Sequence, residues 1–314
     1  MPSLTRRAVL GFLTLALGVG AYSFVRRQRG AKRAKALYAR ALPAPSGPLR
    51  AYHLGHSLVG RDMPAMLAQL AGSGHRYDSQ LGWGTSLMQH WEPDQPVNGF
   101  DVENDHPRFR PAQEALASGD YDAVVLTEMV EIKDAIRYHD SATYLAHWAG
   151  LARQGNPQAR IYLYETWHHT NDPAGWLARI DDDFSERWLG RVLYPALGKT
   201  DAPIYLIPAG QVMAACVRAI TAQGGLDGVT GVDDLMARNA DGTPDTIHFN
   251  DLGAYLVALT HYAVLYQRSP LGLPHQLNRA DGSPADAPSA ALAALMQRTV
   301  WHVVGRHVQT GVAA

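Results

Sequence analysis

The sequence predicts an α/β fold in which a mostly parallel β-sheet lies between two layers of helices. Short apolar, β-branched segments such as Ala123–Thr127 recur along the chain, and segments with helical spacing separate them. Such segments are typical of strands buried on both faces, and their alternation with helices implies a parallel sheet. Because ligands bind at the carboxyl ends of the strands in these sheets, the residues after each strand are the first candidates for a functional site.

The elements are expected in a regular order along the chain. Asp62 can cap the first helix of the folded body, with Pro64 in its first turn. We expect strands at 49–54, 77–81, 123–127, 161–164 and 204–207, and helices at 62–71, 142–154, 184–197, 212–223 and 252–267. Apolar side chains at helical spacing between 292 and 304 predict a last helix that packs back on the same body.

The composition excludes several classes of protein. The chain has 314 residues, of which 46% are apolar and 18% charged, enough for one large domain or two small ones with a buried core. This balance excludes disordered and collagen-like chains. Cys216 is the single cysteine, so neither an intrachain disulfide nor a zinc site made only of cysteines can form.

Charge is distributed unevenly along the chain. Residues 1–40 carry nine Lys and Arg and no Asp or Glu, which leaves 19 basic against 29 acidic residues in the remainder. An acidic main body argues against nucleic acid as a partner. The sequence does not indicate an oligomeric state.

The N-terminus has the pattern of a targeting segment. Residues 8–25 are uncharged, and Arg6 and Arg7 precede them in a Thr-Arg-Arg-Ala-Val-Leu stretch that resembles a twin-arginine export signal. We expect residues 1–25 to be a signal peptide or a membrane anchor. Although basic flanks such as those after residue 25 tend to stay cytoplasmic, we favour export, with the protein periplasmic or anchored facing the periplasm.

Three segments therefore organise the chain. The leader, residues 1–25, precedes a basic helix that is expected to reach about Ala41 and a Pro-rich linker, which together span residues 26–48. Residues 49–314 form the folded body, including the C-terminal helix.

Three stretches that follow predicted strands carry candidate catalytic groups. Ser57 lies in Gly-His-Ser-Leu after the first strand, where a tight turn exposes its hydroxyl and lets its N–H face a developing oxyanion. Gly84 follows the second strand, and glycine lets the backbone approach a substrate closely. Asp245 and His248 form Asp-x-x-His before the helix at 252–267, a spacing that lets the carboxylate orient the imidazole as a general base. Taken singly, each also fits a cap, a turn or a surface residue.

In combination, and in this order, these residues resemble the SGNH (GDSL-like) hydrolase superfamily between about Leu49 and Gln267. The resemblance implies a flavodoxin-like three-layer α/β/α sandwich and serine hydrolysis without a cofactor. It implies that Ser57 is the nucleophile, His248 the base and Asp245 the residue that orients it. The N–H groups of Ser57 and Gly84 would form the oxyanion hole, with Gly82 as the alternative if the register slips by two.

Two positions depart from the pattern of this superfamily. His56 precedes the serine, where Asp or Asn is usual, and Glu128 stands where an oxyanion-binding and substrate-binding Asn is expected after the third strand. An ionised carboxylate only accepts hydrogen bonds and repels an oxyanion. Three outcomes stay open: burial protonates Glu128, another donor replaces it, or the site hydrolyses esters poorly.

Aromatic and histidine side chains after the strands suggest a substrate. Trp83 follows the second strand, and Trp167 and His168 follow the fourth, so we expect these three to contact substrate. Indole rings can stack on sugars, although core packing is an equally good account of each tryptophan. Long loops at the functional edge favour a shaped, polar pocket. We therefore expect a small-molecule or glycan ester, with removal of acetyl groups from a carbohydrate as the leading reaction.

A metal site is the weaker interpretation of the histidines. His53, His56, His168, His169 and His248 would have to converge, but a strand and turn do not present His53 and His56 to one ion, and adjacent His168 and His169 point apart in extended chain. We expect no metal. Besides the esterase, two functions stay open: an exported O-acyltransferase acting on a polysaccharide, and a non-catalytic glycan-binding protein, which the glutamate at 128 motivates.

Overall fold

The computed structural model describes residues 28–313, so the leader expected at residues 1–25 lies outside the described residues. A five-stranded parallel sheet forms the centre, with strand order β2-β1-β3-β4-β5. The strands are β1 (Arg50–His56), β2 (Arg76–Gly82), β3 (Ala123–Thr127), β4 (Arg160–Glu165) and β5 (Ile204–Pro208). The predicted α/β class is confirmed, and this strand order is the flavodoxin-like one.

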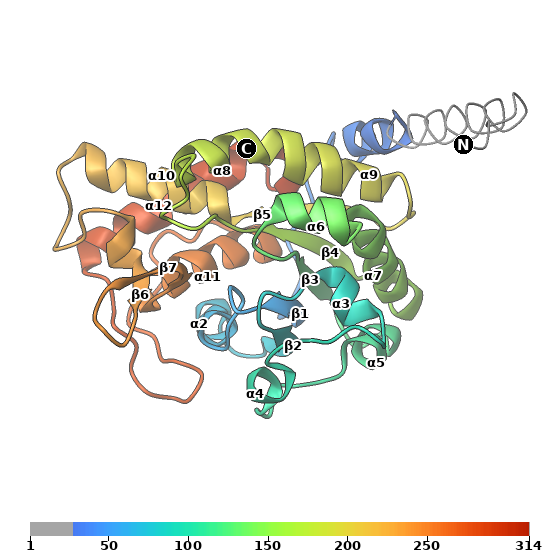
Figure 1. The fold of residues 1–314 in the computed structure, drawn as a ribbon, viewed down its shortest axis with the longest axis horizontal. Coiled ribbons are helices and arrows are strands. Elements are labelled where there is room, and N and C mark those ends of the chain that lie inside the picture. The colour runs from blue at the N-terminus through green and yellow to red at the C-terminus, as the bar shows by residue number, and fades with distance from the viewer. Residues whose placement is uncertain (1–27, 314) are drawn as a thin grey trace, which may run out of the picture.

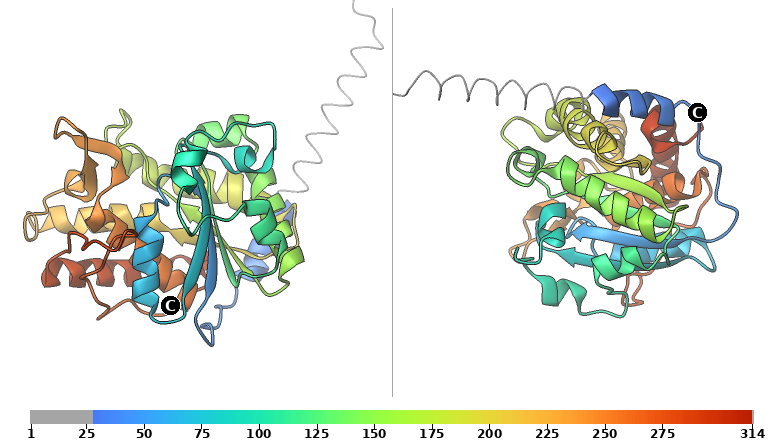
Figure 2. Two further views of the ribbon diagram at one scale, coloured as in Figure 1. Left: turned by 90° about the horizontal axis from the view of Figure 1, so that it is seen from below. Right: turned by 90° about the vertical axis from the view of Figure 1, so that its right-hand side faces the viewer.

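Helices cover both faces of the sheet, as Figures 1 and 2 show. Alternate residues of β3 separate the two layers: Ala123 and Val125 face one core, and Val124 and Leu126 face the other. The first core packs against α2 (Asp62–Ala71), α8 (Trp176–Asp183), α10 (Ala209–Ala222), α11 (Asp251–Tyr266) and α12 (Ala290–Arg306). The second packs against α3 (Leu87–Trp91), α5 (Ala112–Ala117), α6 (Ile132–Tyr138), α7 (Ser141–Gly155), the helical segment η1 (Phe184–Leu193) and α9 (Tyr194–Leu197).

The structure extends several predicted elements. The first strand continues beyond Leu54 to His56, because Gly55 lets β1 approach β3; a Cβ at Gly55 would lie 2.6 Å from Thr127 Cβ. The helix expected at 184–197 begins instead at Trp176 and has π-type turns over Phe184–Leu193. Helix α4 (Phe100–Asn104) lies in the insertion between the second and third strands.

A short hairpin between α10 and α11 is absent from the sequence prediction. After the 3₁₀ turn η2 (Val232–Leu235), strand β6 (Met236–Arg238) pairs antiparallel with β7 (Pro244–Phe249). Asn250 caps α11 directly after β7 by accepting hydrogen bonds from the N–H groups of Leu252 and Gly253. Because α11 is almost entirely apolar and buried among α2, α10 and α12, it fixes the end of β7 to the core.

The N-terminal segment packs against the opposite end of the sheet. Residues 28–37 are helical, and the Arg33 guanidinium is paired with Asp201. The Tyr38 hydroxyl donates to the carbonyl of Ile204, the first residue of β5, at 2.7 Å, and Leu42 N–H donates to Gly311 O at 2.7 Å beside the 3₁₀ turn η3 (Val308–Thr310). Within residues 28–313, no helix is both long and apolar enough to cross a membrane.

Candidate active site

The turn after β1 presents Ser57 at the carboxyl edge of the sheet. β1 lies between β2 and β3, and His56, its last residue, is completely buried. The Nε2–H of His56 donates to the Glu128 carbonyl at 2.9 Å, so Nδ1 is left to accept the weak bond from Leu58 N–H at 3.4 Å. Desolvation lowers the pKa of His56 to about 4. A neutral His56 therefore connects the turn to the end of β3. At this position the SGNH superfamily, which the sequence resembles, usually has Asp or Asn.

The hairpin strand β7 brings an imidazole to this serine across 191 residues of sequence. His248 Nε2 lies 2.9 Å from Ser57 Oγ, and His248 Nδ1 lies 2.9 Å from Asp245 Oδ2. Asp245 Oδ1 also accepts the N–H groups of Ile247 and His248, at 2.7 and 2.8 Å. The sequence analysis expected these residues on a turn before a helix, whereas they lie in strand β7. The side chains of residues 245 and 248 meet there because the Asp245 carboxylate folds back onto the backbone of its own strand.

The charge of Asp245 follows from these contacts. Desolvation acts to raise its pKa, but the N–H and imidazole donors outweigh it and hold the pKa below its usual value. An ionised carboxylate can only accept, so His248 Nδ1 carries the proton and the Nε2 lone pair faces the Ser57 hydroxyl. This is the tautomer that a serine–histidine pair needs for proton transfer.

Two backbone N–H groups near Ser57 are free to bind an oxyanion. Among residues 28–313, neither Ser57 N–H nor Gly84 N–H has an acceptor. Gly84 lies two residues beyond Gly82, which pairs with His56 in the sheet register, and it is exposed with φ of +55°. Gly82, in contrast, is buried and closely packed, because a Cβ there would lie 2.3 Å from Thr85 Oγ1. The positions favour Gly84 over Gly82 as the second donor.

Glu128 does not line the site in the way expected of it. Its side chain is fully buried, and Oε1 accepts the N–H of Met129 at 2.8 Å and of Leu87, at the start of α3, at 3.3 Å. Oε2 is buried with no partner among the described residues. Burial raises the pKa of Glu128 to about 7, against the lowering effect of those N–H donors and of the nearby Ser141 hydroxyl. A side chain without exposed surface cannot touch a substrate, so its predicted contacts with oxyanion and substrate are not found.

Glu128→Gln should therefore change stability more than activity. Because the folded-state pKa is raised, the contribution of Glu128 is present at low pH and is lost as pH rises toward and beyond 7. We expect the free energy of unfolding of the Gln variant, relative to the wild type, to rise between pH 5 and pH 8 by roughly 2 kcal/mol. Glu128→Ala, which strands two N–H groups, should destabilise at both pH values. Complete loss of esterase activity in a folded Gln variant would contradict this and would give Glu128 a chemical role.

Two further residues expected to contact substrate, Trp167 and His168, are buried instead. Trp167 has no exposed surface, and its Nε1–H donates to the Ile247 carbonyl at 2.9 Å. His168 is 2% exposed and lies 3.4 Å from Asp183 Oδ2, in a cluster centred on Arg179. Neither side chain thus presents surface to a substrate: the segment after β4 runs beneath the surface, and Trp167 holds the backbone of β7 next to His248.

His169, which the sequence analysis weighed only as a metal ligand, is the histidine of this segment that lies at the surface. It is exposed, and its Nδ1 lies 2.9 Å from Thr246 Oγ1, while Thr170 N–H donates to Thr246 O at 2.8 Å. Adjacent side chains of extended chain point to opposite sides, so the burial of His168 turns His169 outward.

Trp83 is the expected substrate residue that lies at the surface. Its side chain is 51% exposed, and Nε1–H donates to Glu103 Oε1 at 2.7 Å. The backbone of Gly99 packs against the ring, since a Cβ there would lie 2.3 Å from the indole. One edge and one face of the ring are thus held, one residue before Gly84. Trp176 and Trp188, by contrast, are core residues.

Residues 28–313 contain no group of three or more His, Cys, Asp or Glu side chains placed to hold a metal ion. His53 is fully buried beside His261, with ring centroids 6.0 Å apart. His248 faces Ser57. The described histidines thus do not converge on one point, and the chemistry available at this edge is that of Ser57, His248 and Asp245.

Comparisons with known proteins give weak likenesses only. No protein-family model matches the chain, and no curated protein matches it. Among solved structures, Est24, a carbohydrate acetylesterase from Sinorhizobium meliloti, is 14% identical over 69% of this chain and 96% of its own, with a TM-score of 0.35. A carbohydrate esterase family 3 protein from Talaromyces cellulolyticus is 16% identical over 70% and 97%, with a TM-score of 0.33, and the M. smegmatis aryl esterase is 15% identical over 68% and 96%, with a TM-score of 0.32. Likenesses of this size carry no argument about function, which has to come from the site itself.

Proposed function

We propose that this protein is a serine ester hydrolase of SGNH type. The observation that carries the proposal is the continuous hydrogen-bonded series from Asp245 through His248 to Ser57, with 2.9 Å at both side-chain contacts. A nucleophile within reach of a base that a third group orients is the signature of covalent catalysis by a hydroxyl. Its place at the carboxyl edge of a parallel sheet is where this fold class binds ligands.

The reaction follows from the positions of the atoms. Ser57 Oγ forms a bond to the ester carbonyl carbon while His248 Nε2 takes the hydroxyl proton, and the carbonyl electron pair moves to oxygen. The N–H groups of Ser57 and Gly84 bind this oxyanion. When the carbon–oxygen bond to the alcohol breaks, His248 returns its proton to the leaving alkoxide, and an acyl-serine remains. Water, deprotonated by His248, then cleaves the acyl-serine to release a carboxylic acid and Ser57.

The substrate class proposed is a carbohydrate that carries acetyl or other short acyl groups. Trp83 presents a half-exposed ring, fixed at its Nε1 edge and one face, beside the proposed oxyanion donor. Such a ring offers an apolar surface to the face of a sugar without loss of side-chain freedom. His248 is 46% exposed, so a bulky glycan can reach the catalytic pair from solvent.

The direct test is covalent labelling by a fluorophosphonate, mapped by mass spectrometry. We expect the wild-type chain to be labelled at Ser57 and Ser57→Ala to remain unlabelled, while Ser73→Ala, at an exposed serine, is labelled as the wild type is. Absence of label from folded wild-type protein that still binds acetylated glycan would favour the non-catalytic glycan-binding alternative. If acyl groups are transferred to an added sugar rather than to water, the acyltransferase alternative is correct.

Trp83→Ala should separate glycan recognition from ester chemistry. We expect KM for an acetylated oligosaccharide to rise about tenfold, the equivalent of about 1.4 kcal/mol of lost contact. Hydrolysis of a small aryl acetate, which reaches Ser57 without the ring, should change much less. Steady-state kinetics with both esters measure the two effects, and Trp301→Ala, at a partly buried tryptophan of α12 far along the chain, is the matched control. Equal losses on both esters would show that Trp83 acts on the fold and not on the glycan.

We also propose that the protein is exported, on the pattern of residues 6–25 in the sequence. Fractionation of cells that express the full chain tests this, with Arg6→Lys/Arg7→Lys as the variant. Retention of that variant in the cytoplasm, with the wild type in the periplasm or on its membrane, is the expected result. Cytoplasmic wild-type protein would overturn the proposal.

A further inference from the structure

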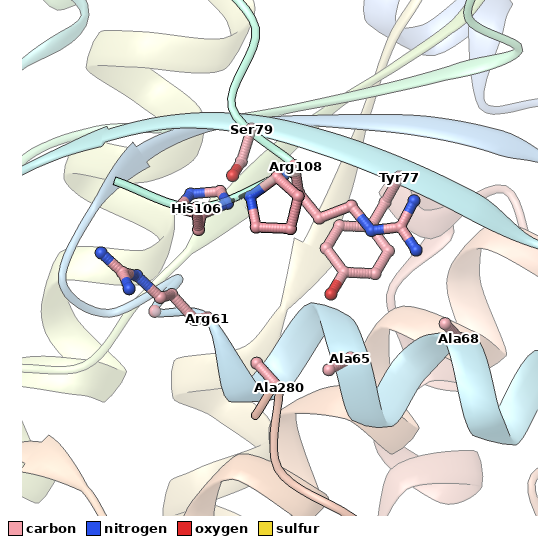
Figure 3. Close-up of a pocket in the computed structure, with 10 residues that line it drawn as sticks. Arg61, Ala65, Ala68, Tyr77, Ser79, His106, Arg108 and Ala280 are labelled. Carbon is pink, nitrogen blue, oxygen red and sulfur yellow. Dashed lines mark hydrogen bonds between the residues drawn. The ribbon is translucent and has the colours of Figure 1, made fainter. Parts of the chain in front are cut away.

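A pocket of about 340 Å³ lies beside the catalytic turn, between α2 and β2 (Figure 3). Its floor is made by Ala65 and Ala68 of α2, and Tyr77 and Ser79 of β2 form the opposite wall. Its size is at the lower end of that of ligand pockets and suits a group no larger than one sugar ring.

The charged side chains that line this pocket are all basic. Arg61, at the start of α2, and Arg108, in the segment that runs along the edge of β2, both contribute to the lining, and no Asp or Glu does. Among the described residues, neither guanidinium has a carboxylate within 4 Å; Arg61 donates to the Val102 carbonyl, and Arg108 lies over the Tyr77 ring, 5.2 Å from its centroid. Two cations in one cavity repel each other, so the pocket favours an anion.

His106 adds a third donor between the two arginines. Its Nδ1 accepts the N–H of Arg108 at 3.1 Å, so the ring proton is on Nε2. That Nε2 is buried and has no partner among residues 28–313. The lining thus contains a buried donor without a partner in addition to the two guanidinium groups, and an anionic acceptor would satisfy that donor.

The pocket adjoins the nucleophile through Gly60. Gly60 belongs to the lining, and a Cβ on it would lie 3.5 Å from the Ser57 carbonyl oxygen. One lining residue therefore belongs to the turn that carries the catalytic serine.

Acidic side chains face a separate hollow of about 710 Å³, which shares Arg61, His106, Pro107 and Ala280 with the pocket. Its other lining residues include Asp62, Glu103, Asp105 and Asp281. Asp62 accepts the Ala280 N–H, and Glu103 holds Trp83. Like charge disfavours an anion in this outer hollow, and the basic pocket favours it, so the two together define where an anionic group can sit.

We propose that the basic pocket binds the carboxylate of an acidic sugar residue, so that the ester substrate is an acylated acidic glycan. A planar carboxylate matches the fork of a guanidinium. The inference rests on the proposed function, because it places the sugar next to the ester that Ser57 cleaves. It gives Arg61 and Arg108 the role of specificity-determining residues.

The test compares two esters that differ only in the carboxylate: acetylated methyl glucuronoside and acetylated methyl glucoside. For the wild type, we expect kcat/KM to be at least about tenfold higher for the acidic ester at low salt, with the difference falling as NaCl screens it. Arg61→Gln/Arg108→Gln should reduce the acidic-to-neutral ratio to about one, mainly through KM. Arg76→Gln, at an exposed arginine of β2 outside the pocket, is the matched control and should keep the wild-type ratio.

A wild-type ratio near one, or a ratio that the double variant does not change, would overturn the inference. If the wild type cleaves neither ester, the proposed function fails, and the pocket is judged by calorimetric binding of glucuronate to the wild type and the double variant. Glucuronate bound by the wild type alone supports a carboxylate site. Inorganic phosphate bound more tightly than glucuronate would replace the sugar carboxylate with a phosphate group as the occupant.

Discussion

Ser57→Ala is expected to lower kcat for a short-chain acetyl ester by about 10⁴-fold to 10⁶-fold, with little change in KM. The variant removes the oxygen that lies 2.9 Å from His248 Nε2 and leaves the two free N–H groups in place. Those donors can still polarise a bound carbonyl, so a residual rate above that in water should remain. Initial rates with an aryl acetate measure the effect, in an assay sensitive enough to detect a kcat about 10⁶-fold below that of the wild type.

His248→Ala in the Ser57→Ala background should cost almost nothing further. Residues that act as one unit in one step have effects that do not add, because the base has no function without the hydroxyl. Asp245→Asn should also be severe, with a loss of about 10⁴-fold in kcat, since an amide cannot keep the proton on Nδ1. Asp245 Oδ1 also binds two backbone N–H groups, so circular dichroism of each variant must show an intact fold.

Additive losses in the double variant would contradict the assignment of these residues to one proton-transfer unit. Ser73→Ala is the matched control, because Ser73 is exposed in the loop between α2 and β2, and it should keep wild-type kinetics. Full activity of Ser57→Ala would end the serine-hydrolase proposal, whatever the behaviour of the other variants.

Acidification from pH 7 to pH 5 is expected to destabilise the fold strongly. His53, His56 and His261 are completely buried, and His90 is 7% exposed. Desolvation lowers the pKa of each: to about 4 for His56, His90 and His261, and well below the ordinary value for His53. An unfolded chain takes up protons near pH 6.5, whereas the folded chain does so only near pH 4. The unfolded state therefore binds more protons between these values, and stability falls as pH falls through this range.

The magnitude makes this one of the larger effects expected for the molecule. Each of these buried histidines lowers the free energy of unfolding by about 2 kcal/mol when the pH falls from 7 to 5. Two buried glutamates act in the opposite sense, because burial raises the pKa of Glu128 to about 7 and that of Glu165 to about 8. Four histidines against two glutamates leave a net loss of about 4 kcal/mol. Because domains are stable by only about 5–15 kcal/mol, we expect stability to be highest near neutral pH and to fall markedly in mild acid.

His261→Phe tests the acid effect directly. The ring of His261 packs 4.7 Å from that of Tyr164, its Nδ1–H donates to Val257 O, and its Nε2 has no partner among the described residues. A phenyl ring fills the same space without titrating, so the difference in unfolding free energy between pH 7 and pH 5 should shrink by about 2 kcal/mol. Urea unfolding at each pH measures it, and His302→Gln, at an exposed position, should leave the difference as it is. An unchanged difference in His261→Phe would show that this histidine does not control acid stability.

The sequence was sufficient for the parts of the molecule that depend on local pattern. Ala123–Thr127 was predicted residue for residue as a buried strand, and Asp62–Ala71 as a helix, because apolar runs and helical spacing are short-range properties. The predicted cap was wrong: Asp62 is the first residue of the helix, and Arg61 stands at the N-cap without a side-chain hydrogen bond. The chain order of Ser57, Gly84, Asp245 and His248 was likewise readable. The hairpin of β6 and β7 was missed, since β6 has only three residues and the six residues of β7 show no regular alternation of buried and exposed side chains.

Only the tertiary structure decided which of the candidate side chains meet and which are buried. Trp83 and Trp167 have the same chemistry and both follow strands, yet Trp83 is half-exposed and Trp167 has no exposed surface. The difference arises because β7 packs over Trp167, whose Nε1–H donates to the Ile247 carbonyl. Glu128 lies in the expected place in the sequence, but its carboxyl turns inward to the N–H groups of Met129 and Leu87. Spacing along a chain fixes the type of element and the order of residues, whereas contacts between residues 191 apart depend on how whole layers pack.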